Sequence, residues 1–203
     1  MAAKKADSGD WFSALSAIIE KEKDEFTKDL SNILSKKGEV ARVVLEDFVK
    51  VWQKFDDLKI HFTLDPSPQE FARKDELTGS WKINEKYDFT GITAINLKDR
   101  SHEEGRIGDA VRAWFYNFNN EVRFRVVFEF CEGENYYKYT GWKRTFGQHI
   151  LYDAPIDKVR FDLLHEVFMD VFKKWFESHI KKDRNIIIRH IKDTYEKGES
   201  FTQ

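Results

Sequence analysis

The feature that most constrains the fold of this chain is a regularly alternating stretch near its middle. Between Val111 and Phe130, apolar and polar residues take turns on either side of the dipeptide Asn119-Asn120. Such alternation is typical of a strand with one buried face, and asparagine tolerates the positive φ angles of a two-residue hairpin turn. The sequence therefore predicts two antiparallel strands whose register is set by that turn, because a slip of one residue would exchange the two faces.

This register predicts which side chains share a face of the sheet. The pairs on the apolar face are Val111 with Phe128, Ala113 with Val126, and Phe115 with Phe124. The pairs on the opposite face are Arg112 with Val127, Trp114 with Arg125, and Tyr116 with Arg123. We therefore expect one face to pack on the core and the other to carry aromatic and basic groups.

A second turn is predicted at Gly133-Glu134, because glycine in the first position suits a type II′ hairpin. Counting from this turn, the partners on the third strand are Phe130 with Tyr137, Phe128 with Tyr139, Glu129 with Lys138, and Arg125 with Trp142. The last two pairs would be an ion pair and a cation–π contact. Both turns assign the same residues to the same faces. The predicted ligand-binding residues on the aromatic and basic face are Arg112, Trp114, Tyr116, Arg123, Arg125, Tyr136, Lys138 and Trp142.

Two interpretations of this face remain open. In the first, arginine stems and indole rings only cover apolar sheet surface while their polar ends reach water. In the second, the aromatic rings stack a planar group and the arginines bind phosphate or carboxylate, so that the face binds a nucleotide, single-stranded nucleic acid or an acidic peptide. The net charge of −2 counts against long nucleic acid, whose affinity depends on many phosphate contacts.

Apolar residues at three- and four-residue intervals predict helices at both ends of the chain. In the N-terminal part we expect a helical hairpin over residues 8–57, with a break at Lys36-Lys37-Gly38. In the C-terminal part, Asp153-Ala154-Pro155 is a helix start signal, and a second helix follows that ends at Gly198. The tail, residues 199–203, is expected to fray.

The predicted elements together indicate an α+β fold. Three further stretches with strand character lie at 58–64, 77–83 and 87–97. We expect an antiparallel β-meander of five to six strands, flanked by the N-terminal helical hairpin and a C-terminal helical pair. The whole chain, 1–203, is predicted to be a single domain in which 58–152 form the sheet and 153–198 the C-terminal helices.

Residues that usually form metal centres or catalytic groups do not occur in recognisable patterns. Cys131 is the only cysteine, so neither a disulfide nor a zinc-ligand spacing exists. The six histidines lack the two-histidine spacing of a helical zinc site, and His179 and His190 fit positions near helix ends. Glycine-rich phosphate loops and nucleophile motifs are missing as well. We therefore expect no cofactor and no metal, and nothing in the sequence favours an enzyme.

The function expected from these patterns is that of a non-catalytic binding protein whose aromatic and basic face meets an anionic or planar partner. Neither a secretory signal nor a run of about 18 apolar residues occurs, so we expect a cytoplasmic protein with no membrane partner. One alternative is an assembly protein that forms homo-oligomers through its long helices. Another is an enzyme on nucleotides or phosphoesters whose residues form no known motif.

Overall fold

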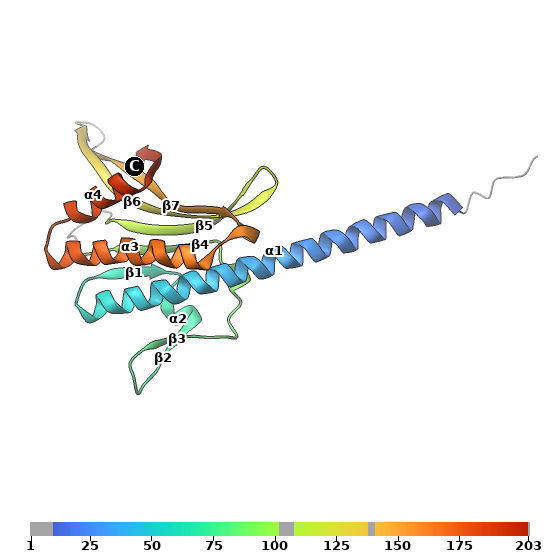
Figure 1. Cartoon of the computed structure of the whole chain (residues 1–203), viewed down its shortest axis with the longest axis horizontal. Coiled ribbons are helices and arrows are strands. Elements are labelled where there is room, and N and C mark those ends of the chain that lie inside the picture. Colours follow the sequence, from blue (N-terminus) through green and yellow to red (C-terminus); the bar gives the residue numbers. More distant parts are fainter. Residues whose placement is uncertain (1–9, 102–107, 138–140, 203) are drawn as a thin grey trace, which may run out of the picture.

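The computed structural model describes residues 10–101, 108–137 and 141–202, and it is an α+β structure (Figure 1). The α+β class and the antiparallel sheet predicted from the sequence are confirmed. The helices are α1 (Asp10–Asp57), α2 (Pro68–Phe71), α3 (Phe161–Ile180) and α4 (Asn185–Thr194). The strands are β1 (Phe62–Asp65), β2 (Ala72–Lys74), β3 (Trp81–Ile83), β4 (Ala94–Asp99), β5 (Ala110–Phe118), β6 (Glu121–Tyr137), β7 (Gly141–Pro155) and β8 (Glu196–Thr202).

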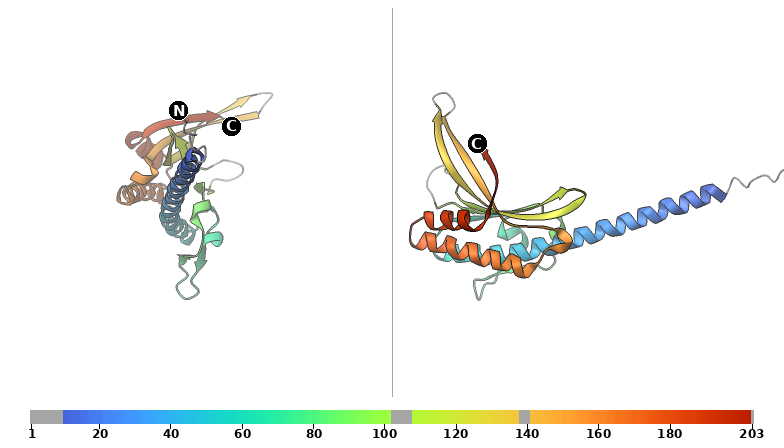
Figure 2. Two further views of the ribbon diagram at one scale, coloured as in Figure 1. Left: turned by 90° about the vertical axis from the view of Figure 1, so that its right-hand side faces the viewer. Right: turned by 45° about the horizontal axis from the view of Figure 1, so that its top comes forward.

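The large sheet has six strands in the order β1-β4-β5-β6-β7-β8, and every neighbouring pair is antiparallel. β2 and β3 form a separate two-stranded sheet. The right-hand view of Figure 2 shows α1, α3 and α4 together on one side of the large sheet. The other side of the sheet is not covered by any of these helices.

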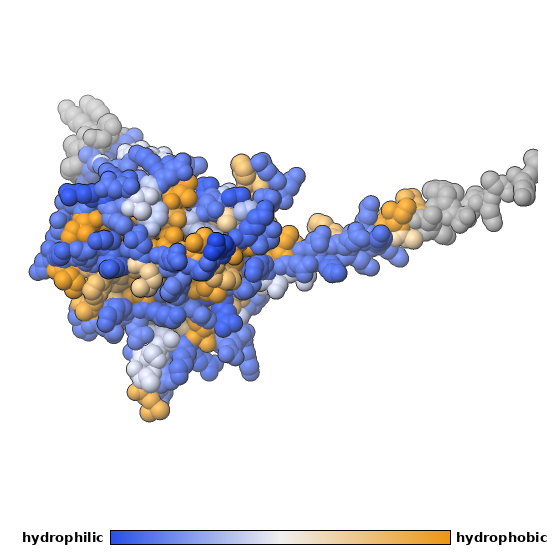
Figure 3. Space-filling model, viewed as in Figure 1, coloured by the Kyte–Doolittle hydropathy of each residue, from blue (hydrophilic) through white to orange (hydrophobic). Residues whose placement is uncertain are grey.

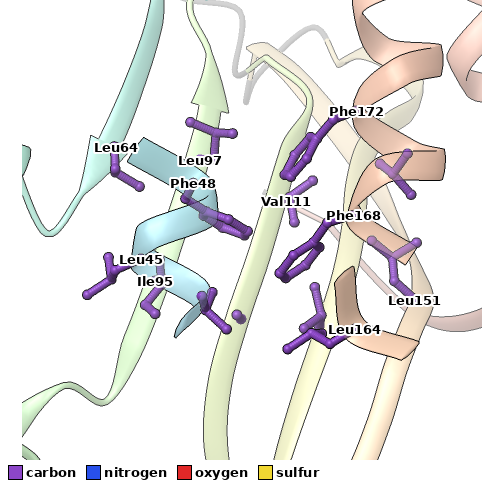
Figure 4. Close-up of a cluster of buried hydrophobic side chains, with 14 of the residues drawn as sticks. Leu45, Phe48, Leu64, Ile95, Leu97, Val111, Leu151, Leu164, Phe168 and Phe172 are labelled. Carbon is purple, nitrogen blue, oxygen red and sulfur yellow. The ribbon is translucent and has the colours of Figure 1, made fainter. Parts of the chain in front are cut away.

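The hydrophobic core lies between the sheet and the helices on that one side. Figure 4 shows Phe48 of α1 and Phe168 of α3 pointing toward Val111 of β5. Trp175 of α3 is fully buried, and its ring centroid lies 5.1 Å from that of Phe128 on β6. Removing these large apolar groups from water is the main force that holds the helices on the sheet.

The central hairpin has the register that the sequence predicts. Asn119 and Asn120 form its turn with φ angles of 49° and 63°, which is the left-handed region that a two-residue turn of this type needs. The observed partners include Val111–Phe128, Ala113–Val126, Phe115–Phe124, Arg112–Val127, Trp114–Arg125 and Tyr116–Arg123. The alternation along β5 and β6 therefore does separate an apolar face from an aromatic and basic one.

The predicted N-terminal helical hairpin over residues 8–57 is wrong, because α1 passes through Gly38 without a break. Gly38 is buried beside the 3-10 turn Phe89–Gly91, and a Cβ atom there would lie 3.2 Å from Thr90 Cγ2. A helix interior tolerates glycine at a cost of about 1 kcal/mol relative to alanine. Gly38 therefore allows another segment to approach the helix closely and does not end it.

The predicted turn at Gly133-Glu134 is also wrong, because β6 continues through this dipeptide and pairs with β7 on both sides of it. The register shifts between Cys131 and Gly133, which marks a β-bulge. The side chain of Glu132 lies over Gly147 of β7, where a Cβ atom would overlap it. Glycine within a strand often marks a bulge or a close approach, and both occur here.

The C-terminal part differs from the prediction in two places, although the expected pair of helices is present. Asp153-Ala154-Pro155 ends β7, and α3 starts only at Phe161. The residues after α4 do not fray but form β8 beside β7, where the rings of Phe146 and Phe201 stack with centroids 5.4 Å apart.

Candidate binding face of the sheet

The side of the sheet that faces away from the helices carries a cluster of basic and aromatic side chains. Arg112, Trp114 and Tyr116 alternate along β5, and Arg123 and Arg125 alternate along β6. Trp114 lies opposite Arg125, and Tyr116 lies opposite Arg123. All five side chains are half-buried, so each still reaches solvent. These five residues are called the arginine face below.

Two of these arginines are held by Asp153 of β7, which lies opposite Arg125. Asp153 Oδ2 accepts hydrogen bonds from Arg125 Nε at 2.5 Å and from Tyr116 Oη at 2.7 Å. Its Oδ1 accepts a hydrogen bond from Arg123 Nε at 2.8 Å. Arg125 Nη2 also donates to Tyr116 Oη at 3.0 Å, and its guanidinium carbon lies 4.8 Å from the centre of the tyrosine ring. One carboxylate therefore fixes the positions of two cations and a phenol.

These hydrogen bonds set the charges of the cluster. Burial by itself raises the pKa of Asp153, but hydrogen bonds from Tyr116, Arg125 and Arg123 lower it below its ordinary value. The hydrogen bond to Asp153 also raises the pKa of Arg123. Two cations around Asp153 leave one net positive charge, which Glu121, 3.7 Å from Arg123 Nη1, offsets in part. Because each guanidinium has five N–H donors, donors remain that can bind a phosphate or carboxylate without first having to be ordered.

Arg112 is paired with a different carboxylate. Its Nη2 donates to Glu129 Oε1 at 2.6 Å, and Gln148 Nε2 donates to Glu129 Oε2 at 3.0 Å. Glu129 is only 1% exposed, so this pair is internal to the sheet. The backbone partner of Glu129 is Gln148, which corrects the predicted pairing of Glu129 with Lys138. Arg112 is therefore the least available of the three arginines.

Two of the other predicted residues, Tyr136 and Trp142, lie away from the arginine face along the sheet. Tyr136 and Trp142 are backbone partners of each other near the far end of the β6–β7 hairpin. They lie roughly 35 Å from Arg125 along β6, at about 3.3 Å per residue. The predicted Arg125–Trp142 cation–π pair is therefore wrong, and Tyr116 supplies the ring next to Arg125. Lys138 lies outside the residues that the structure describes.

Asp153 is the main residue that sequence reasoning missed at this site. Its position before Ala154-Pro155 is typical of a helix start, and no local signal marks it as part of a strand. Because β6 and β7 pair as far as Tyr137 and Gly141, counting from the predicted turn at Gly133-Glu134 leads from Arg125 to Trp142 and not to Asp153. Only the pairing of β6 with a distant strand identifies this carboxylate.

A second polar cluster lies at the C-terminal end of α3. Asp99 is 1% exposed and accepts hydrogen bonds from Ser101 Oγ at 2.5 Å and from the backbone N–H of Ser101 at 2.8 Å, while His179 Nε2 lies 3.1 Å from its Oδ2. Although burial raises the pKa of Asp99, these hydrogen bonds lower it below its ordinary value. Arg184 forms a two-pronged pair with buried Asp109, with Nη2 2.6 Å from Oδ1 and Nε 3.0 Å from Oδ2.

Asp99, Asp109, His179 and Arg184 of this second cluster line a pocket of about 200 Å³. Ser101 bonds to the carboxylate and not to the imidazole of His179, which is not the order of nucleophile, base and orienting acid in a catalytic triad. Each acid instead has a basic side chain as its partner. Among the described residues, no group of three or more His, Cys, Asp or Glu side chains could hold a metal ion. The arrangement is therefore that of paired charges closing one end of the core.

No protein family, no curated protein and no solved structure matches this chain. In the part of the chain that the structure describes, no helix has the length and apolar character needed to cross a lipid bilayer. The function is therefore inferred from the structure itself. This is an α+β protein whose six-stranded sheet has helices on one side and, on the other, arginines ordered by a carboxylate.

Proposed function

We propose that this chain is a binding protein that takes up a nucleotide on its arginine face. The observation that supports this best is the pair Arg123 and Arg125, ordered by Asp153 next to Trp114, on a side of the sheet that no described helix covers. Ordered guanidinium groups suit phosphate, since they offer paired N–H donors at fixed positions. An aromatic ring nearby suits a base.

The surroundings of Trp114 favour a planar ligand group. Its partner on the other neighbouring strand, β4, is Ala94, which is exposed and small. A small neighbour on one side and Arg125 on the other leave room for a base to stack on the indole while its phosphate reaches the arginines. Base–aromatic stacking contributes about 1–3 kcal/mol per base.

The charge balance favours a small ligand over a long nucleic acid. The cluster of Arg123, Arg125 and Asp153 has one net positive charge, which Glu121 beside Arg123 offsets in part, and the chain as a whole has a net charge of −2. Long single strands need many phosphate contacts, which such a surface does not offer. A cytoplasmic setting, where nucleotides are abundant, is part of the proposal and agrees with the single cysteine.

The test is calorimetric titration of the protein with ATP and, separately, with inorganic phosphate at low salt. Arg125→Gln should weaken ATP binding by about 10- to 100-fold, since a charge-assisted hydrogen bond contributes about 1.5–3 kcal/mol. Arg144→Gln is the matched control. Arg144 is also a strand arginine paired with a carboxylate, Glu134 Oε1 at 2.8 Å, and its side chain is 23% exposed against 27% for Arg125. It lies on the distant part of β7 and should leave binding unchanged.

The comparison between ligands tests the role of Trp114. Trp114→Ala should weaken ATP binding while leaving phosphate binding nearly unchanged, because only the nucleotide has a base to stack. Absence of heat and of any fluorescence change with both ligands at millimolar concentration would contradict the proposal, and so would equal losses in Arg125→Gln and Arg144→Gln. Binding of an acidic peptide but not of ATP would contradict the stacking part of it.

A further inference from the structure

The first half of α1 projects from the rest of the protein (Figure 1). The helix reaches the body at Lys36, whose Nζ lies 5.3 Å from the ring centre of Phe161, and at Lys37, whose Nζ lies 5.4 Å from the ring centre of Phe115. Residues 10–35, called the projecting segment below, extend beyond these contacts. At 1.5 Å per residue the projecting segment is roughly 39 Å long.

The projecting segment carries large apolar side chains on its surface, and Figure 3 shows separate apolar groups among the hydrophilic ones along this part of the helix. The exposed side chains of this kind are Leu15, Ile18, Ile19, Phe26, Leu30 and Leu34. Their three- and four-residue spacing places them on one side of the helix, and the same spacing continues into Val40, Val44 and Phe48, which are fully buried in the core. Phe26 is 70% exposed. An apolar stripe of this kind normally packs against another element, and contiguous exposed apolar surface marks an interaction site.

We infer that the projecting segments of two copies of this chain pair side by side in antiparallel orientation, so that the protein forms a homodimer. Two such segments overlap along their full length when Asp10 of one copy faces Ser35 of the other. The described apolar pairs in this register are Leu15 with Leu30 and Ile19 with Phe26, and each pair occurs twice because the interface has two-fold symmetry. The register in which the two segments overlap fully therefore also places these apolar residues opposite each other.

Most charged residues in the middle of the projecting segment fit the same register, although Glu20 of one copy would face Glu25 of the other. Its centre falls between Glu22 and Lys23, so Glu22 of one copy would face Lys23 of the other. Lys21 would face Asp24 in the same way. Opposite charges therefore meet at the two-fold axis, where the apolar stripe is interrupted. Charges that flank a helix interface determine the partner and its orientation.

A parallel arrangement is disfavoured on two grounds. Each charged residue would face the same residue of the second copy, which brings like charges together. The folded parts of both copies would also lie at the same end of the helix pair. There, each would occupy the space beside its own α1 that the α1 helix of the other copy needs. Charge complementarity and the length of the segment therefore both select the antiparallel dimer.

The first test is the oligomeric state, measured by light scattering during size-exclusion chromatography over a range of concentrations. The expected mass is twice the chain mass of 24.2 kDa. Leu30→Glu should raise the dissociation constant at least 100-fold. Leu77→Glu is the matched control, because Leu77 is 98% exposed in the β2–β3 hairpin, far from α1's projecting segment, and should leave the dimer intact. Near-ultraviolet circular dichroism checks that the body remains folded in both variants.

The second test determines the orientation by disulfide cross-linking in a Cys131→Ser background. Glu22→Cys lies near the two-fold axis and should cross-link two copies on its own. Leu15→Cys alone should not, because its two copies lie about 22 Å apart along the helices. Leu15→Cys combined with Leu30→Cys should cross-link efficiently.

Two results would overturn the inference. One is a chain that remains monomeric up to a concentration of several hundred micromolar, including the case in which the projecting segment binds lipid vesicles or another protein instead. The other is efficient cross-linking of Leu15→Cys by itself, which would indicate a parallel pair. Neither result depends on whether ATP binds to the arginine face, so the two proposals stand or fall separately.

Discussion

At the scale of single residues, Asp153 determines what the arginine face can do. Without it, Arg123 and Arg125 would repel each other and adopt many rotamers. With it, both guanidinium groups and the Tyr116 hydroxyl are held by hydrogen bonds between 2.5 and 2.8 Å from the carboxylate oxygens. A binding surface whose side chains are already ordered loses less conformational entropy when a ligand arrives.

The first prediction concerns Asp153→Asn. The substitution should lower the free energy of unfolding by about 1–2 kcal/mol near pH 7, since charge-assisted hydrogen bonds are lost in a site that solvent partly screens. Because the pKa of Asp153 is lower in the folded protein than its ordinary value of 3.8, its stabilising contribution is complete above that value and is lost as the pH falls through the lower folded pKa. Urea unfolding should therefore show a constant difference between wild type and variant above about pH 5 that shrinks below about pH 4. A difference that grows on acidification would contradict this account.

At the scale of elements, the predictable parts are those set by neighbouring residues. The β5–β6 hairpin is correct to the residue because Asn119-Asn120 and the alternation on both sides of it are local signals. Gly38 and Gly133 are also strong local signals, yet both mislead, since each glycine is used for packing or a bulge and not for a chain reversal. Whether such a glycine forms a turn, a close contact or a bulge depends on segments that are distant in the sequence.

The same limit explains the candidate site. The residues on β5 and β6 could be named from the sequence because their register depends on one tight turn. Asp153 could not, because the β6–β7 hairpin extends well beyond the predicted turn at Gly133-Glu134, and counting from that turn gives Trp142 as the partner of Arg125. Each of the two strands has one extra residue at a bulge, so the two register shifts cancel and the misplaced turn accounts for the error.

A second prediction tests why α1 is continuous at Gly38. Gly38→Ala removes the conformational cost of glycine in a helix, about 1 kcal/mol, but brings a methyl group 3.2 Å from Thr90 Cγ2. Thr90→Ser removes that methyl group and keeps the hydroxyl that donates to Asp88 Oδ1 at 2.6 Å. Gly38→Ala should therefore stabilise the Thr90→Ser variant by about 1 kcal/mol and the wild type by less. Thermal denaturation of the four proteins gives the coupling, and equal effects in both backgrounds would exclude the proposed contact.

At the scale of the whole molecule, stability depends on one core that joins the N-terminal and C-terminal helices through the sheet. Trp175 shows this most directly. Its ring centroid lies 4.7 Å from that of Phe62 on β1, 5.1 Å from that of Phe128 on β6 and 6.1 Å from that of Phe55 on α1. Segments from both ends of the chain are therefore stabilised by the same side chain.

A third prediction follows for Trp175→Ala. The substitution should lower the free energy of unfolding by about 3–5 kcal/mol, which combines lost apolar burial with a cavity that the rigid sheet cannot close. Met169→Ala on the same helix is the control, because Met169 is 59% exposed and its truncation should cost no more than about 0.5 kcal/mol. Guanidinium unfolding followed by circular dichroism measures both. Similar losses in the two variants would contradict the position of Trp175 at the centre of the core.

The continuity of α1 through Gly38 also has a mechanical consequence. A hinge at that point would let the N-terminal half of α1 move relative to the sheet. An unbroken helix is stiff, so it fixes both the distance and the orientation of its outer end. Whatever attaches to its outer end is held at a set span and angle from the sheet. In the inferred dimer, the two arginine faces would therefore lie at a fixed distance from each other. A ligand with two anionic groups separated by that distance would bind both faces at once and gain avidity.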